Sequence, residues 1–328
     1  MRRSDDALAT IALVSRLCAD DLQPLKASEF WKLMSRPDSR PSDLLGMSAG
    51  ALATLGGVSG VLAERVVALL GRSTSLAFEI ERLQHSGITA VTPFDEHYPN
   101  CWSDRLGVKA PPLLYAAGTV ELLNHRGLGI VGSRDVSPSG GEAAVEAATC
   151  ASRRRIPLVS GGARGVDQLA MNSAFNSGGA VVGLLADSLS RKLAKNDVRA
   201  AIHNEQALMC TPYNPDAGFS AGNAMGRNKL IYAQSTLTLV IASDEGKGGT
   251  WSGATEALDH KFGRVAVWRG PGEGPGNEAL ERRGAVPISD LDDLGQLLDD
   301  GDADTTPDAS PLASEAEQGV LFSIATAD

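Results

Sequence analysis

The chain has 328 residues, of which 43% are hydrophobic, and its formal net charge at pH 7 is −10. No apolar run approaches the ~20 residues that cross a bilayer, and the polar start at Met1–Asp6 gives no sign of a signal peptide. The four cysteines are widely spaced without a CxxC pair, which argues against a disulfide framework or a zinc site. We therefore do not expect an integral membrane protein. We expect a cytoplasmic protein with two domains, or with one large domain and an appendage.

The negative charge is concentrated at the C-terminal end. Residues 284–328 contain eleven acidic residues and no Lys or Arg, so residues 1–283, with 30 basic and 29 acidic groups, carry net +1. The stretch 126–229 carries 12 basic and 8 acidic groups, a net charge of +4. A neutral body with a basic middle is compatible with a nucleic-acid partner. The acidic end is interpreted either as a solubilising segment or as one that competes with DNA phosphates for the basic stretch.

Residues 1–75 are predicted to form a small helical domain, because apolar residues recur at helical spacing and prolines separate the segments. Within it, residues 52–66 resemble a helix-hairpin-helix or SAM-like segment, with Ser59 where that motif usually has its second glycine. The turn of such a motif presents backbone N–H groups to a DNA phosphate. The alternative is a protein contact, and the sequence leaves both open.

Residues 76–290 are predicted to form a second domain, in which short apolar runs alternate with helical patterns. After a helix at 76–86 and a strand at 89–92, the predicted strands are 128–132, 156–160, 180–186, 207–210, 236–242 and 265–268. The helices between them are predicted at 140–154, 165–177, 196–204, 224–234 and 252–262. This order predicts an α/β fold with a Rossmann-like, doubly wound parallel sheet. A short helix within 270–283 and another at 290–298 follow, and residues 291–328 are predicted to be an acidic, flexible tail.

The segments that follow the strands are the candidates for a binding site, because open parallel sheets bind ligands at the carboxyl ends of their strands. Three such segments, residues 132–137, 160–167 and 242–253, are rich in Gly and Ser and contain a cation each. A fourth basic element, Gly226–Lys229, is predicted to begin a helix. Glycine loops and helix N-termini favour anions. The predicted phosphate-binding residues are Gly132, Ser133, Arg134, Ser137, Ser160, Gly161, Gly162, Arg164, Gly165, Arg227, Asn228, Lys229, Gly248, Gly249 and Thr250.

The sequence favours a binding protein over an enzyme. The letters GxGxxG at 127–132 fall inside a predicted strand, and neither GxxxxGK[ST] nor GxSxG occurs. The five histidines have no metal-ligand spacing. Asp167 is the acid of the glycine loops that could be a general base, and capping the next helix or holding Arg164 is the favoured role. No catalytic residue, cofactor or metal is predicted.

Four motifs occur in the order and spacing of the DprA/Smf family: Pro111–Tyr115 with Gly118, Val131–Arg134 with Ser137, Ser160–Asp167, and Arg227–Ile231. The chain resembles this family over about residues 76–270. The resemblance implies an extended Rossmann fold, a homodimer, single-stranded DNA binding through backbone phosphates, and loading of a RecA-type recombinase. It also implies a DNA phosphate pocket lined by Gly132, Ser133, Arg134, Ser160, Gly161, Arg164, Arg227 and Asn228.

The chain departs from the family pattern in three ways. Ala170-Met171 stands where the family has Ala-His, no C-terminal winged helix is expected, and Gly248–Glu256 replaces a Ser-Gly-Ser segment. The last of these resembles the GGxGT…E signature of cytokinin-activating phosphoribohydrolases. We interpret the chain as a divergent branch that binds single-stranded DNA without catalysis, in recombination, DNA protection or phage defence. Two alternatives stay open: a nucleotide-binding sensor or antitoxin-like regulator of a cognate toxin, and a phosphoribohydrolase-like enzyme with Glu256 as its catalytic acid or base.

Two consequences of this interpretation concern DNA binding. We expect Arg134→Ala and Arg227→Ala to weaken binding with little effect on folding, because both are assigned to phosphate contacts. We also expect weak sequence preference, because aromatic residues make up only 5% of the chain and stacking platforms must be few.

Overall fold

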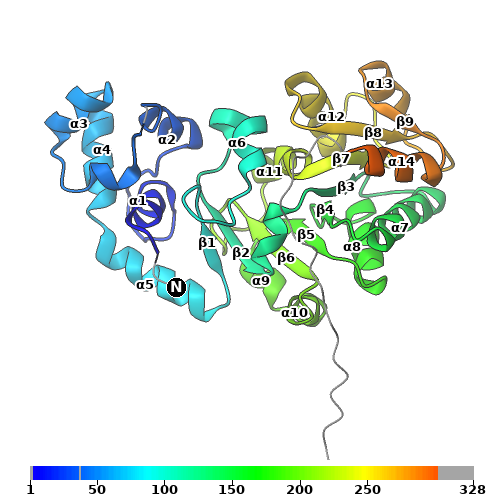
Figure 1. Ribbon diagram of the computed structural model, residues 1–328, viewed down its shortest axis with the longest axis horizontal. Helices are drawn as coiled ribbons and strands as arrows, with labels where there is room; N and C mark the ends of the chain where they lie inside the picture. The colour runs from blue at the N-terminus through cyan, green and yellow to red at the C-terminus, as the bar shows by residue number, and fades with distance from the viewer. Residues whose placement is uncertain (1–2, 37, 302–328) are drawn as a thin grey trace, which may run out of the picture.

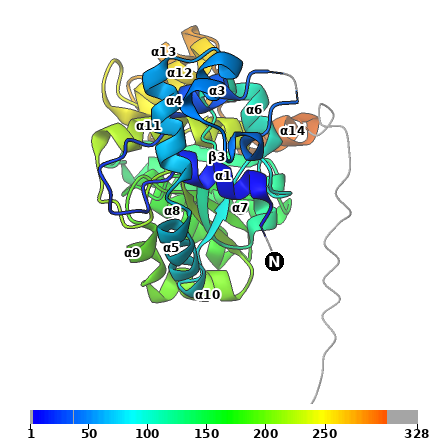
Figure 2. The same ribbon diagram turned by 90° about the vertical axis from the view of Figure 1, so that its left-hand side faces the viewer.

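The computed structural model describes residues 3–36 and 38–301 (Figure 1). The chain begins with the helices α1 (Asp5–Val14), α2 (Ala27–Leu33), α3 (Ala49–Gly56), α4 (Gly60–Leu70) and α5 (Ser73–His85). Figure 2 shows them in front of the rest of the molecule. Their core includes Leu13, Phe30 and Leu69, whereas Ile11 and Ala12 of α1 pack into the core under the sheet. The helices expected before residue 76 are present, and the division into two domains there stays a prediction.

Within the described residues, nine strands form one mixed sheet in the order β1-β2-β6-β5-β4-β3-β7-β8-β9. The strands are β1 (Thr89–Val91), β2 (Leu114–Gly118), β3 (Gly127–Val131), β4 (Leu158–Ser160), β5 (Val181–Leu184), β6 (Ala207–Thr211), β7 (Ser235–Val240), β8 (Arg264–Trp268) and β9 (Val286–Ile288). All neighbours from β6 to β9 are parallel, and β2 pairs antiparallel with both β1 and β6. The predicted α/β class is confirmed, with an antiparallel edge that the sequence analysis did not include.

Helices cover both faces of the sheet (Figure 1). One face is covered by α7 (Pro138–Arg153), α8 (Val166–Asn176), α9 (Leu189–Leu193), α10 (Asn196–His203) and α14 (Leu291–Gly301). The other is covered by α6 (Asn100–Leu106), α11 (Ala221–Gln234), α12 (Gly248–His260) and α13 (Asn277–Arg282). Because side chains alternate along a strand, Leu128 and Ile130 face the first layer and Val131 the second.

The order of the strands creates a switch point beside β3. From β3 the chain proceeds through β4, β5 and β6 on one side, and then returns to place β7, β8 and β9 on the other side. The loops after β3 and β7 therefore turn to opposite faces of the sheet and leave a crevice between them. Ligands bind at this place in open α/β sheets.

The beginning of the predicted acidic tail is part of the folded body. Helix α14 buries Leu294 and Leu298 in the same core as α7, because these leucines share one side of the helix. Residues 302–328, with the apolar cluster at 320–324, lie outside the described residues. Over residues 3–36 and 38–301, none of the helices has the length and apolarity that a membrane span requires.

Candidate nucleic-acid interface

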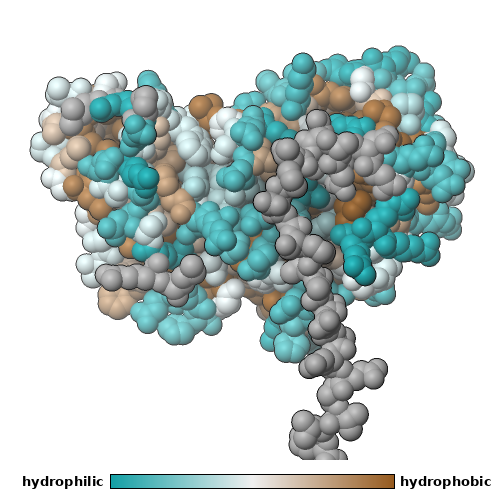
Figure 3. Space-filling model, viewed as in Figure 1, coloured by the Kyte–Doolittle hydropathy of each residue, from teal (hydrophilic) through white to brown (hydrophobic). Residues whose placement is uncertain are grey.

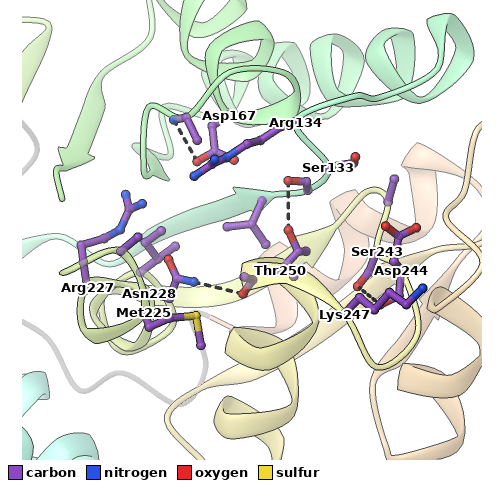
Figure 4. Close-up of a pocket in the computed structure, with 18 of the residues that line it drawn as sticks. Ser133, Arg134, Asp167, Met225, Arg227, Asn228, Ser243, Asp244, Lys247 and Thr250 are labelled. Atoms are coloured by element: carbon purple, nitrogen blue, oxygen red, sulfur yellow. Dashed lines mark hydrogen bonds between the residues drawn. The ribbon is translucent and has the colours of Figure 1, made fainter. Parts of the chain in front are cut away.

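A pocket of about 430 Å³ opens between the carboxyl ends of β3 and β7 (Figure 4). Its walls are the loop after β3, the loop after β7 with the first turn of α12, and one side of α11, and Ala163 and Asp167 of the segment after β4 also line it. We call it the switch-point pocket. Eight of the predicted phosphate-binding residues line it: Gly132, Ser133, Arg134, Arg227, Asn228, Gly248, Gly249 and Thr250.

Glycine allows the loops after β3 and β4 to touch. Gly165 has φ +86°, and a Cβ atom there would lie 2.3 Å from the carbonyl oxygen of Ser133. The N–H of Val166 donates to that same oxygen at 3.2 Å. Because Gly165 has no side chain, the β4 loop supports the β3 loop that lines the pocket.

Gly165→Ala should destabilise the protein by about 2–4 kcal/mol, because the new methyl group adds a steric clash to an unfavourable positive φ. The free energy of unfolding in urea measures the effect. Gly178→Ala is the matched control, because Gly178 has φ +74° and a Cβ atom there would meet no atom within 4 Å. The control should lose only about 1 kcal/mol. Equal losses in the two variants would show that the contact between the loops has no role.

Arg227 is the most deeply buried cation of the switch-point pocket. The residue is only 5% exposed, one of its guanidinium N–H groups donates to the carbonyl of Leu184, and its Nε has no hydrogen-bond partner. Burial lowers the pKa of Arg227, and Asp167 is the largest opposing influence. No carboxylate of the described residues forms an ion pair with it within 4.0 Å. The guanidinium therefore lies at the pocket without a close anion.

The sequence analysis placed Arg227 at the start of a helix, and this was wrong. Helix α11 begins at Ala221 with Ser220 as its cap, so Arg227 lies in the middle of the helix. Its guanidinium instead packs against Gly161, where a Cβ atom would overlap it. The pocket therefore receives the Arg227 side chain from the middle of α11, and Ala221 of the first turn lines it as well.

Asp167 has a structural role in the loop after β4. Its Oδ2 accepts the N–H of Gly161 at 3.1 Å and that of Ala163 at 3.4 Å. Burial raises its pKa, and the charge of Arg227 lowers it. Neither favoured role is observed: α8 has Gly165 as its cap without a side-chain cap bond, and Arg164 forms an ion pair with Asp135 at 2.7 Å. Asp167 holds the loop that faces Arg227.

Arg134 and Phe219 form an exposed side of the pocket entrance. The Cζ of Arg134 lies 5.5 Å from the centroid of the Phe219 ring, which is a cation–π contact. Phe219 precedes α11 and is 57% exposed, and Met225 on α11 is 38% exposed. In Figure 4, Arg134, Asp167 and Arg227 lie at one end of the pocket and Ser243, Asp244 and Lys247 at the other.

The first turn of α12 forms the opposite wall. Its cap residue, Lys247, makes no side-chain hydrogen bond to the helix. The Thr250 hydroxyl donates to the carbonyl of Gly132 at 3.0 Å, and the Asn228 amide donates to the carbonyl of Gly249 at 3.0 Å. These bonds hold the three walls together and leave the first N–H groups of α12 beside the pocket.

Seven predicted residues do not line the switch-point pocket: Ser137, Ser160, Gly161, Gly162, Arg164, Gly165 and Lys229. Ser137 caps α7 by accepting the N–H of Gly140, and Ser160 is buried and donates to the carbonyl of Ile130. Lys229 lies on another side of α11. Glu256, the proposed catalytic residue of the enzyme alternative, also lies outside the lining and faces Lys109 at 3.7 Å.

The sequence analysis did not name several lining residues as members of the site, among them Phe219, Met225, Asp244 and Lys247. Phe219 had a visible signal, because a lone aromatic residue between Gly218 and Ser220 is unusual in a segment of small residues. No feature of the sequence marked Met225 as a site residue, because the direction of its side chain depends on where α11 begins.

Comparisons with known proteins match most of the chain. The family model of DNA recombination-mediator protein A matches residues 89–299. A Mycobacterium tuberculosis protein named for DNA processing protein DprA is 28% identical over 270 residues, which cover 74% of this chain and 67% of that protein. The DNA processing protein DprA of Bacillus subtilis is 24% identical over 178 residues, which cover 54% of this chain and 59% of that protein.

Two solved structures share the fold. DNA processing protein A from Streptococcus pneumoniae is 21% identical and gives a TM-score of 0.63, with 91% of this chain and 98% of that chain covered. DNA processing protein A from Helicobacter pylori, described for its single-stranded DNA binding mode, is 23% identical and gives a TM-score of 0.53. That match covers 65% of this chain and 96% of the other.

Proposed function

This chain belongs to the DNA recombination-mediator protein A family, and from that premise we propose that its switch-point pocket binds backbone phosphates of single-stranded DNA. The observation that carries the proposal is Arg227, a guanidinium at the pocket that is 5% exposed and has no close anion. A buried charge without a partner is costly, and a phosphate supplies both the anion and acceptor oxygens. Recombination is the pathway that the family description names.

Two further features favour a nucleic-acid strand over a free nucleotide. The exposed ring of Phe219 offers a base a flat surface beside the cation of Arg134. Lys247 lies at the opposite end of the pocket, so cations are available to more than one phosphate (Figure 4). The Helicobacter pylori relative is described as binding single-stranded DNA.

We also propose that binding proceeds without catalysis. Asp167, the buried carboxylate at the pocket, accepts two backbone N–H groups and thereby holds its own loop. Asp244 is exposed at the rim. Asp135, the third carboxylate of the pocket, forms an ion pair with Arg164 at 2.7 Å. None of the three is arranged as a general base with a neighbouring nucleophile.

The test compares equilibrium binding of a fluorescent single-stranded oligonucleotide, the matching duplex and nucleoside monophosphates. We expect the single strand to bind best, with affinity falling as salt rises by a log–log slope of about 0.7 per phosphate neutralised. Binding of a monophosphate but not of the oligonucleotide would contradict the proposal and support the nucleotide-sensor interpretation.

Phe219→Ala should weaken binding of single-stranded DNA by about five- to a hundredfold, because stacking of a base on an aromatic ring contributes about 1–3 kcal/mol. Fluorescence anisotropy with a labelled oligonucleotide measures the effect. Phe78→Ala is the matched control, because Phe78 is 69% exposed on α5 and does not line the pocket. Unchanged affinity in both variants would remove the stacking role of Phe219.

A further inference from the structure

A second pocket, of about 370 Å³, opens on another side of α11, between the N-terminal helices and the α/β body. We call it the junction pocket. Its walls are the segment after α1, residues 111–115 before and within β2, the segment after β6, and α11. Figure 3 shows the N-terminal helices as a lobe beside the body. The Asn214 amide donates to the carbonyl of Arg16 at 2.8 Å, which ties the two parts together at this pocket.

The junction pocket is lined by cations and by no carboxylate of the described residues. Arg16 comes from the N-terminal segment, Lys109 precedes β2, and Lys229 comes from α11. Lys109 is 3.7 Å from Glu256, which does not itself line the pocket. Burial lowers the pKa of Lys229, and the charge of Glu256 only partly offsets this. An anionic ligand would restore a favourable environment for this ammonium group.

The rest of the wall suits a flat, apolar group. Pro111, Pro112 and Pro212 line the pocket together with the ring of Tyr213. The Tyr213 hydroxyl donates to the carbonyl of Asn223 at 2.9 Å, which fixes the ring. Glycine at position 226 allows the Tyr213 ring to lie against α11, because a Cβ atom at Gly226 would lie 2.6 Å from the Tyr213 hydroxyl oxygen.

Helix α11 separates the two pockets. Asn223, Gly226 and Lys229 line the junction pocket, whereas Met225 and Asn228 line the switch-point pocket. An α-helix with its side chains is only about 10–12 Å across. A chain that leaves one pocket therefore reaches the other by crossing a single helix.

We propose that the junction pocket binds a further nucleotide of the same DNA strand, with its base against Tyr213 and the prolines and its phosphate at Lys229 and Arg16. The inference rests on the proposed function and extends it, because it adds the N-terminal helices to the DNA-binding surface. Flat apolar surfaces and cations bind bases and phosphates of any sequence, so the extension carries no sequence preference.

The experiment measures fluorescence anisotropy with oligothymidylates of increasing length, from one that fills only the switch-point pocket to one that spans both pockets. Lys229→Met should weaken binding of the long oligonucleotide on the order of tenfold and lower its salt slope by about 0.7, with the short one unaffected. Tyr213→Ala should act in the same way, and Tyr213→Phe should retain binding. Lys32→Met, an exposed lysine of α2 that lines neither pocket, is the control.

The comparison of the two lengths separates the outcomes. A loss in Lys229→Met that is equal for both lengths, or absent from both, overturns the junction pocket and leaves the proposed function intact. Failure of the wild-type protein to bind either length overturns both proposals. Far-ultraviolet circular dichroism of each variant establishes that it is folded.

Discussion

Arg134→Ala should lower the affinity for single-stranded DNA by roughly ten- to a hundredfold, because a charge-assisted hydrogen bond to phosphate contributes about 1.5–3 kcal/mol. Arg134 lies at the pocket entrance, and its contact with Phe219 is a cation–π contact at the surface. The thermal midpoint of unfolding should therefore stay within about a degree of the wild-type value. Fluorescence anisotropy over a range of salt measures the loss and should give a smaller salt slope, by about 0.7.

Arg164→Ala is the matched control for this prediction. Arg164 belongs to the neighbouring loop and is exposed, but it forms an ion pair with Asp135 and does not line the switch-point pocket. Its removal should change the affinity much less than the removal of Arg134. Equal losses would mean that the strand also contacts Arg164 on the β4 loop, which the family resemblance included in the phosphate pocket.

Arg227→Ala should both abolish tight DNA binding and destabilise the fold by about 2–5 kcal/mol, because truncating a buried side chain leaves a cavity and an unpaired backbone carbonyl. The substitution removes the donor to the Leu184 carbonyl and the charge that opposes the desolvation of Asp167. Sequence analysis expected little effect on folding; because Arg227 is only 5% exposed, we now expect a loss of stability instead. Chemical denaturation with urea measures the free energy of unfolding.

The pH dependence of that destabilisation has a definite sign. Without Arg227, the pKa of Asp167 rises further, because Arg227 is the charge that lowers it. A carboxyl whose pKa is higher in the folded protein takes up its proton there first, so the fold gains stability as the pH falls through that pKa. The deficit of Arg227→Ala should therefore shrink at acidic pH and persist at neutral pH. Wild-type stability in this variant at neutral pH would contradict the coupling of Arg227 to Asp167.

The sequence predicted the central strands because each is an apolar run between polar or glycine-rich segments. Strands β2 and β9 were not predicted, because prolines lie next to one and within the other. Pro111-Pro112 precedes β2, and Pro287 lies within β9, where proline usually argues against a strand. Strand β9 tolerates it because it lies at the edge of the sheet, where one side of the backbone needs no partner.

The same analysis found the loops of the site more reliably than the directions of its side chains. Strand ends converge by topology, so the loops after β3 and β7 were predicted to meet, and they do. Helix starts were obscured by Gly222 in α11 and by Gly248 and Gly249 in α12, because glycine disfavours helices. Side chains two positions apart on an α-helix point in directions that differ by about 200° around the helix axis. Arg227 and Lys229 were therefore grouped in one site, although they line different pockets.

Few positions of helix α11 should accept amino-acid substitutions. Leu230, Ile231 and Tyr232 are buried in the body, and the outward sides of the helix line one pocket or the other. On an ordinary surface helix the outward residues are interchangeable. On α11 each of them is constrained by the pocket that it lines. Sequence drift along this segment should concentrate in the first turn at Gly222, which lines neither pocket. A substitution at another position of α11 should require a compensating substitution in the pocket wall that faces it.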